Sequence, residues 1–326
     1  MKTKLELTLR TLLKGAGQVM FQGSEWTGLL FLCGIFWGAM ESGRDIVAWG
    51  ALVGLSVSTW AGYLLHEPHA EGRAGLWGFN GILVGCAFPT FLGNSPLMWL
   101  ALVLAAAATT WVRTGFNHVM APWKVNSLTF PFVFLSWLFL LATRMLDGLP
   151  AEYLSAPELT MHFSTAVGTS LLDLLVYWLR GISQVFLVNS WVTGLFFLLA
   201  LLVSNRWAAL WAAIGSAVGV LVALLYQAPG SDIANGLYGF SPVLTGIALG
   251  CTFYRPGLRS ALWALAGVVM TCFVQAAMDT WFLPWGLPTF TVPFCLTTWL
   301  FLLPLYKFDA FKADHSHWHK KDGPCT

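Results

Sequence analysis

The stretch that decides the fold is Gly75-Leu76-Trp77-Gly78-Phe79-Asn80-Gly81-Ile82-Leu83-Val84-Gly85. It returns 161 residues later as Gly236-Leu237-Tyr238-Gly239-Phe240-Ser241-Pro242-Val243-Leu244-Thr245-Gly246, close to half a chain length away. Glycines occupy three matching positions, an aromatic pair lies between them, and a short apolar run follows. Glycine permits tight turns and close backbone approach, while the apolar run is shorter than the ~20 residues of a membrane-spanning helix. Short or interrupted apolar segments at matching places in two halves indicate a transport site.

The composition is that of a polytopic helical membrane protein. Of 326 residues, 57% are hydrophobic and only 10% are charged, whereas ordinary soluble domains carry about 25% charged residues. The net charge is +2 and the basic residues are scattered, so no nucleic-acid partner is expected and membrane lipid is the expected surrounding. The six cysteines show no metal-binding spacing, so we expect no metal and no other cofactor.

Further matches between the two halves indicate an internal duplication. Gln18-Val19 corresponds to Gln184-Val185, 166 residues later. At an offset of 162 residues, Thr129-Phe130-Pro131-Phe132 corresponds to Thr291-Val292-Pro293-Phe294. Identities at a nearly constant offset across a whole half are hard to explain by a shared apolar composition alone.

The apolar segments divide evenly between the halves. They cover 8–22, 26–41, 46–65, 76–92, 97–115 and 129–146, and then 169–188, 192–204, 207–226, 237–253, 259–279 and 290–306. If the glycine-bounded segments are re-entrant half-helices, five full spans remain in each half, and an odd number inverts the second half. The expected fold class is therefore an all-α polytopic membrane protein with ten transmembrane helices plus two re-entrant half-helices in two inverted repeats.

The expected domains follow from this arrangement. Residues 1–150 form the first inverted repeat with an amphipathic N-terminal helix, residues 151–306 form the second, and residues 307–326 form a charged, histidine-containing tail. The excess of Lys and Arg in cytoplasmic loops places both termini in the cytoplasm. In this scheme Arg44 lies inside, while the acidic loop 147–159 lies outside.

Two Thr-x-Pro-Phe motifs begin the last segment of each half. Pro131 and Pro293 have no N–H to donate, so carbonyls about one turn earlier lose a partner. Free backbone groups at membrane depth are tolerated only when buried in protein or lining a water-filled cavity. One interpretation is that Thr129 and Thr291 only cap their own helices. The symmetric duplication favours the other, in which both hydroxyls line a polar path.

The predicted path carries almost no charge, because neither glycine-bounded stretch nor threonine motif contains Asp, Glu, Lys or Arg. Ion-coupled transport usually needs an ionisable group within the membrane, whereas a neutral solute does not. Aromatic rings would form flat walls, leucines would lie one turn beyond them, and amides would stand at opposite entrances. The residues concerned are Phe79, Phe240, Leu83, Leu244, Gln18 and Gln184. Such a slot suits a small planar amide, although each ring alone is more simply explained by packing.

On these motifs the chain resembles the urea transporters, and specifically their bacterial members, from about Gly15 to about Leu305. The resemblance implies ten spans plus two tilted half-helices, a pore within each protomer, a homotrimer, and passive movement of urea across the cell (inner) membrane. It also implies that Phe79 and Phe240 bracket flat urea, that Thr129 and Thr291 line the central constriction, and that Gln18 and Gln184 match family positions held by glutamine or glutamate. Ser241-Pro242 replaces the Asn-Gly of the first copy, so the second half-helix is expected to begin with different hydrogen bonds.

Two other functional classes remain as alternatives. One is a channel or transporter for another small neutral solute, such as ammonia or a short amide. Ammonia would need no flat aromatic clamp, and ion coupling would need a buried charge. An intramembrane enzyme would need a nucleophile with a base, or converging metal ligands, and the symmetric core offers only threonines, glutamines and aromatics, so no enzyme is expected. His315, His317 and His319 in the tail are interpreted as solvated residues rather than as metal ligands.

Overall fold

The computed structural model describes residues 4–65, 69–160 and 162–306, and in these ranges the regular structure is helical, without strands. The third expected domain, the tail 307–326 with its histidines, lies outside the described residues. The helices of the first half are α1 (Lys4–Gln18), α2 (Glu25–Glu41), α3 (Ile46–Leu64), α4 (His69–Arg73), α5 (Phe79–Phe91), α6 (Pro96–Met120) and α7 (Phe130–Ala142).

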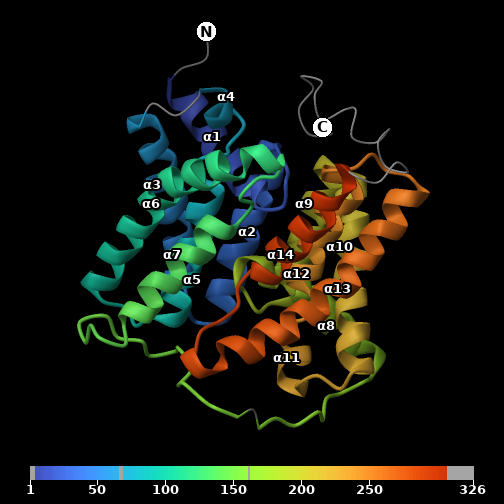
Figure 1. Ribbon diagram of the computed structural model, residues 1–326. Coiled ribbons are helices and arrows are strands. Elements are labelled where there is room, and N and C mark those ends of the chain that lie inside the picture. Colours follow the sequence, from blue (N-terminus) through green and yellow to red (C-terminus); the bar gives the residue numbers. More distant parts are fainter. Residues whose placement is uncertain (1–3, 66–68, 161, 307–326) are drawn as a thin grey trace.

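The second half repeats this order helix for helix. Its helices are α8 (Leu171–Ser183), α9 (Trp191–Ser204), α10 (Arg206–Leu225), α11 (Gly230–Ala234), α12 (Phe240–Ile247), α13 (Leu258–Phe282) and α14 (Val292–Leu302). Figure 1 shows the equivalent short helices α4 and α11 at opposite ends of the molecule.

The two halves meet through reciprocal hydrogen bonds. Thr27 Oγ1 on α2 donates to Ala200 O on α9 at 3.1 Å, and Thr193 Oγ1 on α9 donates to Gly34 O on α2 at 2.7 Å. Because early residues of each helix contact late residues of the other, these equivalent helices pack antiparallel. Such self-complementary contacts are the mark of a twofold relation.

A second reciprocal pair joins the ends of the two halves. Trp137 Nε1 on α7 donates to Pro288 O at 2.9 Å, and Trp299 Nε1 on α14 donates to Asn126 O at 2.9 Å. Each indole therefore links its own helix to the loop that precedes the equivalent helix of the other half.

Glycines hold α5 directly against α3. The backbone of Gly50 lies on Gly85 O and that of Gly54 on Gly81 O, so close that a Cβ would collide at either position. Arg44 Nη2 before α3 donates to Pro89 O near the end of α5 at 2.6 Å. Helix α5 thus runs antiparallel along most of α3. This path differs from the expected one, in which segment 76–92 returns to its own end of the molecule.

A sharp bend lies elsewhere, between α8 and α9 of the second half. Residues Leu171–Phe186 and Trp191–Ser204 meet at 73°, which makes them a broken span or a re-entrant loop. Four helices, α3, α6, α10 and α13, are long and apolar enough to cross a membrane by themselves, or up to five spans if this bent pair counts as one, within the described ranges. Helix length alone therefore does not reach the expected ten spans.

The charges around α2 correct one detail of the predicted topology. Arg10 and Lys14 pair with Glu25 at the start of α2, at 3.5 and 3.9 Å. Arg44 follows the end of α2, and its guanidinium lies 3.9 Å from the ring centroid of Tyr153 in the acidic loop. Arg44 therefore shares an end of the molecule with loop 147–159 rather than opposing it. The physical reason is that the later part of α1 lies beside the start of α2, as the ion pairs of Arg10 and Lys14 with Glu25 show.

Candidate functional site

Thr129 and Thr291 meet at the contact between α7 and α14. Their Oγ1 atoms lie 2.6 Å apart, and each residue is only 3% exposed. Neither side chain caps its own helix, so the interpretation of these threonines as simple helix caps is wrong. Cys295 Sγ lies 3.4 Å from Thr129 Oγ1. The structure thus brings the two predicted hydroxyls face to face at a buried polar point shared by both halves.

The backbone just before each threonine has a left-handed conformation. Leu128 has φ 53° and Phe290 has φ 49°. The same conformation occurs after the two glutamines, at Phe21 with φ 62° and Leu187 with φ 58°. Residues other than glycine adopt it at a cost of order 1–3 kcal/mol, and such strain is concentrated at functional sites. Sequence reasoning missed all four positions, because no glycine marks them and only their pairing by the repeat could have found them.

Gln18 and Gln184 each bind a backbone carbonyl directly before one of the two glycine-bounded stretches. Gln18 Nε2 donates to Ala74 O and Gln184 Nε2 donates to Asn235 O, each at 2.9 Å. The two acceptors follow α4 and α11, which lie at opposite ends of the molecule. The predicted amides therefore do lie towards opposite ends, and each already uses one amide hydrogen to position backbone.

The predicted aromatic and leucine walls begin the short helices α5 and α12. Phe79 and Phe240 are 8% and 9% exposed, and Leu83 and Leu244, one turn further, are fully buried. All four side chains belong to one hydrophobic core that also contains residues of α7 and α14. The structure therefore gathers these predicted residues around the same core as the threonine pair.

The starts of α5 and α12 are supported differently, as the sequence predicts. Asn80 Oδ1 accepts the backbone N–H of Phe132 at 3.1 Å, and Asn80 Nδ2 donates to Leu128 O at 3.5 Å. Ser241 stands in its place in the second half, and its buried hydroxyl has no partner among the described residues. Helix α12 also gives way after Ile247 to a π-helical turn over Ala248–Thr252.

Further buried hydroxyls lie beyond the threonine pair on the same two helices. Ser136 on α7 and Thr298 on α14 each follow their threonine by seven residues, which is two helical turns and the same face. Both residues are fully buried, and both oxygens are without a partner in the part of the chain that the structure describes. Buried polar atoms without partners are rare in folded proteins and call for an explanation. Sequence reasoning missed this pair, although its 162-residue spacing repeats that of the threonines.

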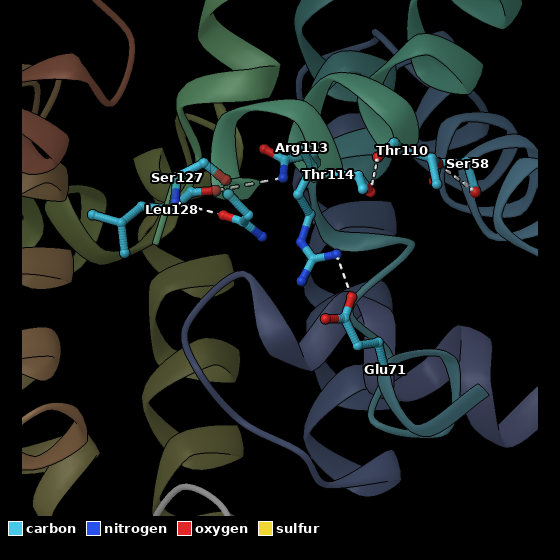
Figure 2. Close-up of polar contacts among 9 residues, drawn as sticks. Ser58, Glu71, Thr110, Arg113, Thr114, Ser127 and Leu128 are labelled. Carbon is cyan, nitrogen blue, oxygen red and sulfur yellow. Dashed lines mark hydrogen bonds and ion pairs between the residues drawn. The ribbon is translucent and has the colours of Figure 1, made fainter. Parts of the chain in front are cut away.

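Polar side chains of α6 bind residues of α3 and α4 (Figure 2). Arg113 Nη1 forms an ion pair with Glu71 Oε2 of α4 at 2.7 Å, and its guanidinium carbon lies 5.9 Å from the centroid of the Phe79 ring. Thr110 Oγ1 donates to Ser58 O on α3 at 2.9 Å. Arg113 is 7% exposed, and its ion pair joins segments that are far apart in the chain.

Comparison with known proteins adds independent information. The family model described as "Urea transporter" matches residues 9–306. The chain is similar to urea transporter 1 of Ovis aries, with 32% identity over 299 residues that cover 89% of this chain and 75% of the relative. It is also similar to urea transporter 1 of Rattus norvegicus, with 33% identity over 298 residues that cover 90% of this chain and 76% of the relative.

Proposed function

This chain belongs to the urea transporter family, a family of membrane transport proteins, and from that premise we propose that it conducts urea passively down its gradient through a pore within each protomer. The observation that carries the proposal is the hydroxyl pair of Thr129 and Thr291, which lies buried at the contact between the two halves. A buried polar point without charge suits a neutral solute that both donates and accepts hydrogen bonds.

Passage of urea exchanges hydrogen bonds at the threonine pair. A hydroxyl both donates and accepts, so each threonine donates to the urea oxygen or accepts a urea N–H once the bond between the two hydroxyls opens. The unpartnered oxygens of Ser136 and Thr298 offer further acceptors on the same helix faces. Each hydrogen bond that urea loses along the path is replaced by one to the next hydroxyl. Urea therefore avoids the free-energy cost of a buried, unpaired polar group.

Walls of the path give it shape selectivity. The rings of Phe79 and Phe240 form flat contacts at the starts of α5 and α12, and Leu83 and Leu244 narrow the path one turn further. Gln18 and Gln184 position the loops at the two entrances through their bonds to backbone carbonyls. The two glycine-bounded stretches and the two threonine motifs contain no Asp, Glu, Lys or Arg, so transport is not coupled to an ion gradient.

The proposed topology uses α1 and α8 as the re-entrant elements. In each half the remaining long segments, α2, α3, α5, α6 and α7 or their equivalents, then cross the membrane, and their odd number inverts the second half. Both termini lie in the cytoplasm of a cell whose inner membrane holds the protein. Arg44 then lies outside with loop 147–159, and Lys14 lies inside.

The proposed assembly is a homotrimer embedded in lipid. Large apolar side chains are exposed on the outer helices, among them Trp26, Trp60, Leu100, Leu221 and Leu262. Exposed apolar surface of this kind is suited to lipid tails and to contact between subunits. The trimeric number itself rests on the resemblance to the family.

Urea flux into proteoliposomes, followed by stopped-flow light scattering, tests the proposal. We expect a flux well above that of protein-free liposomes, driven only by the urea gradient and unchanged when proton and sodium gradients are collapsed. Accumulation of urea against its gradient that depends on either ion would contradict a passive channel. Faster flux of ammonia or of a short amide than of urea would favour the alternative substrate.

A further inference from the structure

The first half of the molecule binds its own guanidinium group beside the glycine-bounded loop. Arg113 Nη1 bonds Glu71 Oε2 at 2.7 Å (Figure 2). Its guanidinium carbon lies 5.9 Å from the centroid of the Phe79 ring. A carboxylate and an aromatic ring are the two groups that bind guanidinium best, through charge-assisted hydrogen bonds and cation–π attraction. In the first half, both partners of the Arg113 guanidinium are therefore supplied by the chain itself.

The second half keeps the carboxylate at the equivalent place and lacks the guanidinium. By the repeat, Asp232 takes the position of Glu71, Gln275 that of Arg113, and Asp279 that of Asn117. Asp232 Oδ1 accepts from Ser231 Oγ at 3.2 Å and Asp279 Oδ1 from Thr289 Oγ1 at 2.8 Å. Within the described ranges neither aspartate forms an ion pair.

The charge on these aspartates is therefore poorly compensated. Burial raises the pKa of the Asp232 carboxyl, and the hydrogen bond from Ser231 only partly opposes this rise. About one turn before Asp279 on α13, Gln275 is 2% exposed, and its amide oxygen is buried without a partner in the described structure. Among the described residues no ion pair involves either carboxylate, and Arg180 Nη1 donates instead to Ala234 O at 2.8 Å.

A cavity of about 220 Å³ lies against both aspartates. Its walls are largely aromatic and apolar, and several of its residues are exposed, so it opens to the surface. In the first half the larger ring of Trp77 packs onto Gly62 and Gly72, whereas the second half has the smaller Tyr238 at the equivalent place. The polar lining residues are Gln227, Asp232, Tyr238, Asp279 and Thr280, and the aromatic ones include Phe163, Tyr226 and Phe273.

The lining selects a class of ligand. The described residues contain no group of three or more His, Cys, Asp or Glu side chains that could hold a metal ion, so the donor set is poor for a bare metal. Aromatic walls beside carboxylates favour an organic cation, and the volume limits it to a small one. We propose that this cavity binds a small guanidinium-type cation through Asp232 and Asp279, as the first half binds the tethered guanidinium of Arg113.

Isothermal titration calorimetry of the purified full chain in detergent tests the proposal, with methylguanidinium as the probe at constant ionic strength. We expect one saturable site in the parent protein. Asp232→Asn and Asp279→Asn should each weaken binding about tenfold, because each removes a charge-assisted hydrogen bond. Glu71→Gln, the matched change in the first half, should leave the dissociation constant of methylguanidinium unchanged.

A second variant copies the first half into the second. Gln275→Arg places a tethered guanidinium beside Asp232 and should abolish methylguanidinium binding, while the thermal unfolding midpoint is kept or raised. Absence of saturable binding to the parent, or an affinity of both Asp→Asn variants equal to that of the parent, would overturn the proposal. Unchanged affinity in these variants combined with displacement by urea would place the cation in the solute path instead.

Discussion

The starts of α5 and α12 are equivalent by sequence and unequal in structure. Asn80 accepts a hydrogen bond from Phe132 N in the first turn of α7 and donates one to Leu128 O just before it. Ser241 has a buried hydroxyl without a described partner. By contrast, the threonines and the two glutamine bonds are nearly identical in the two halves. The residues proposed to touch the solute have kept the symmetry, and the residues that support them have diverged.

The supporting residues also differ between the two halves near the proposed entrances of the path. The ion pair of Arg113 with Glu71 has no counterpart in the second half, where Gln275 and Asp232 occupy the equivalent places. A duplicated transporter can lose symmetry in its supports without closing its path, because a support acts only through the position of the residue it holds. The following predictions test this division between path and support.

The largest expected effect is all-or-none labelling from one side of the membrane. In a background without reactive native thiols, Glu152→Cys and Asp45→Cys should react with an impermeant maleimide only from outside, and Lys124→Cys only from inside. The reason is that Arg44, next to Asp45, packs on Tyr153 in the same loop as Glu152. Labelling of Asp45→Cys from the inside would show that α1 crosses the membrane after all.

The next effect concerns stability and compares the two unequal starts. Asn80→Ala should lower the free energy of unfolding by ~1–3 kcal/mol, because it leaves the buried N–H of Phe132 unpaired. Ser241→Ala should be neutral or slightly stabilising, because it removes a buried hydroxyl that has no described partner. Denaturant unfolding in detergent, monitored by circular dichroism, measures both. Equal losses would mean that Ser241 has a partner equivalent to that of Asn80.

A smaller effect is expected at the aromatic walls, where the two halves should behave alike. Phe79→Ala and Phe240→Ala should each reduce the preference for urea over bulkier amides by several-fold, since loss of a ring removes a flat contact worth ~1 kcal/mol. Flux ratios for urea and acetamide in proteoliposomes measure the preference. A folded variant with an unchanged ratio would show that the ring serves only to pack the core.

The sequence alone predicted an all-helical chain and different hydrogen bonds at Ser241, and it singled out Thr129 and Thr291, which the structure brings together. It did not predict where the chain bends, because an apolar segment has the same hydropathy whether it crosses the membrane or returns to the side from which it entered. The sequence pattern favours a turn-forming role for the glycines of 75–85, yet Gly81 and Gly85 serve the close contact of α5 with α3. The ion pair of Arg113 was also missed, because its partner lies 42 residues away and no local pattern links them.

The threonine pair tests the central claim most directly. Urea flux should be measured by stopped-flow light scattering for the parent, Thr129→Val, Thr291→Val and the double variant, since valine keeps the shape of threonine and removes its hydroxyl. A lost hydrogen bond in a buried constriction raises the permeation barrier by ~1–3 kcal/mol, so each single variant should lose about tenfold in flux, to a similar extent, while remaining folded. Parental flux in the double variant would contradict the account, because urea would then cross without using the hydroxyls at the centre of the molecule.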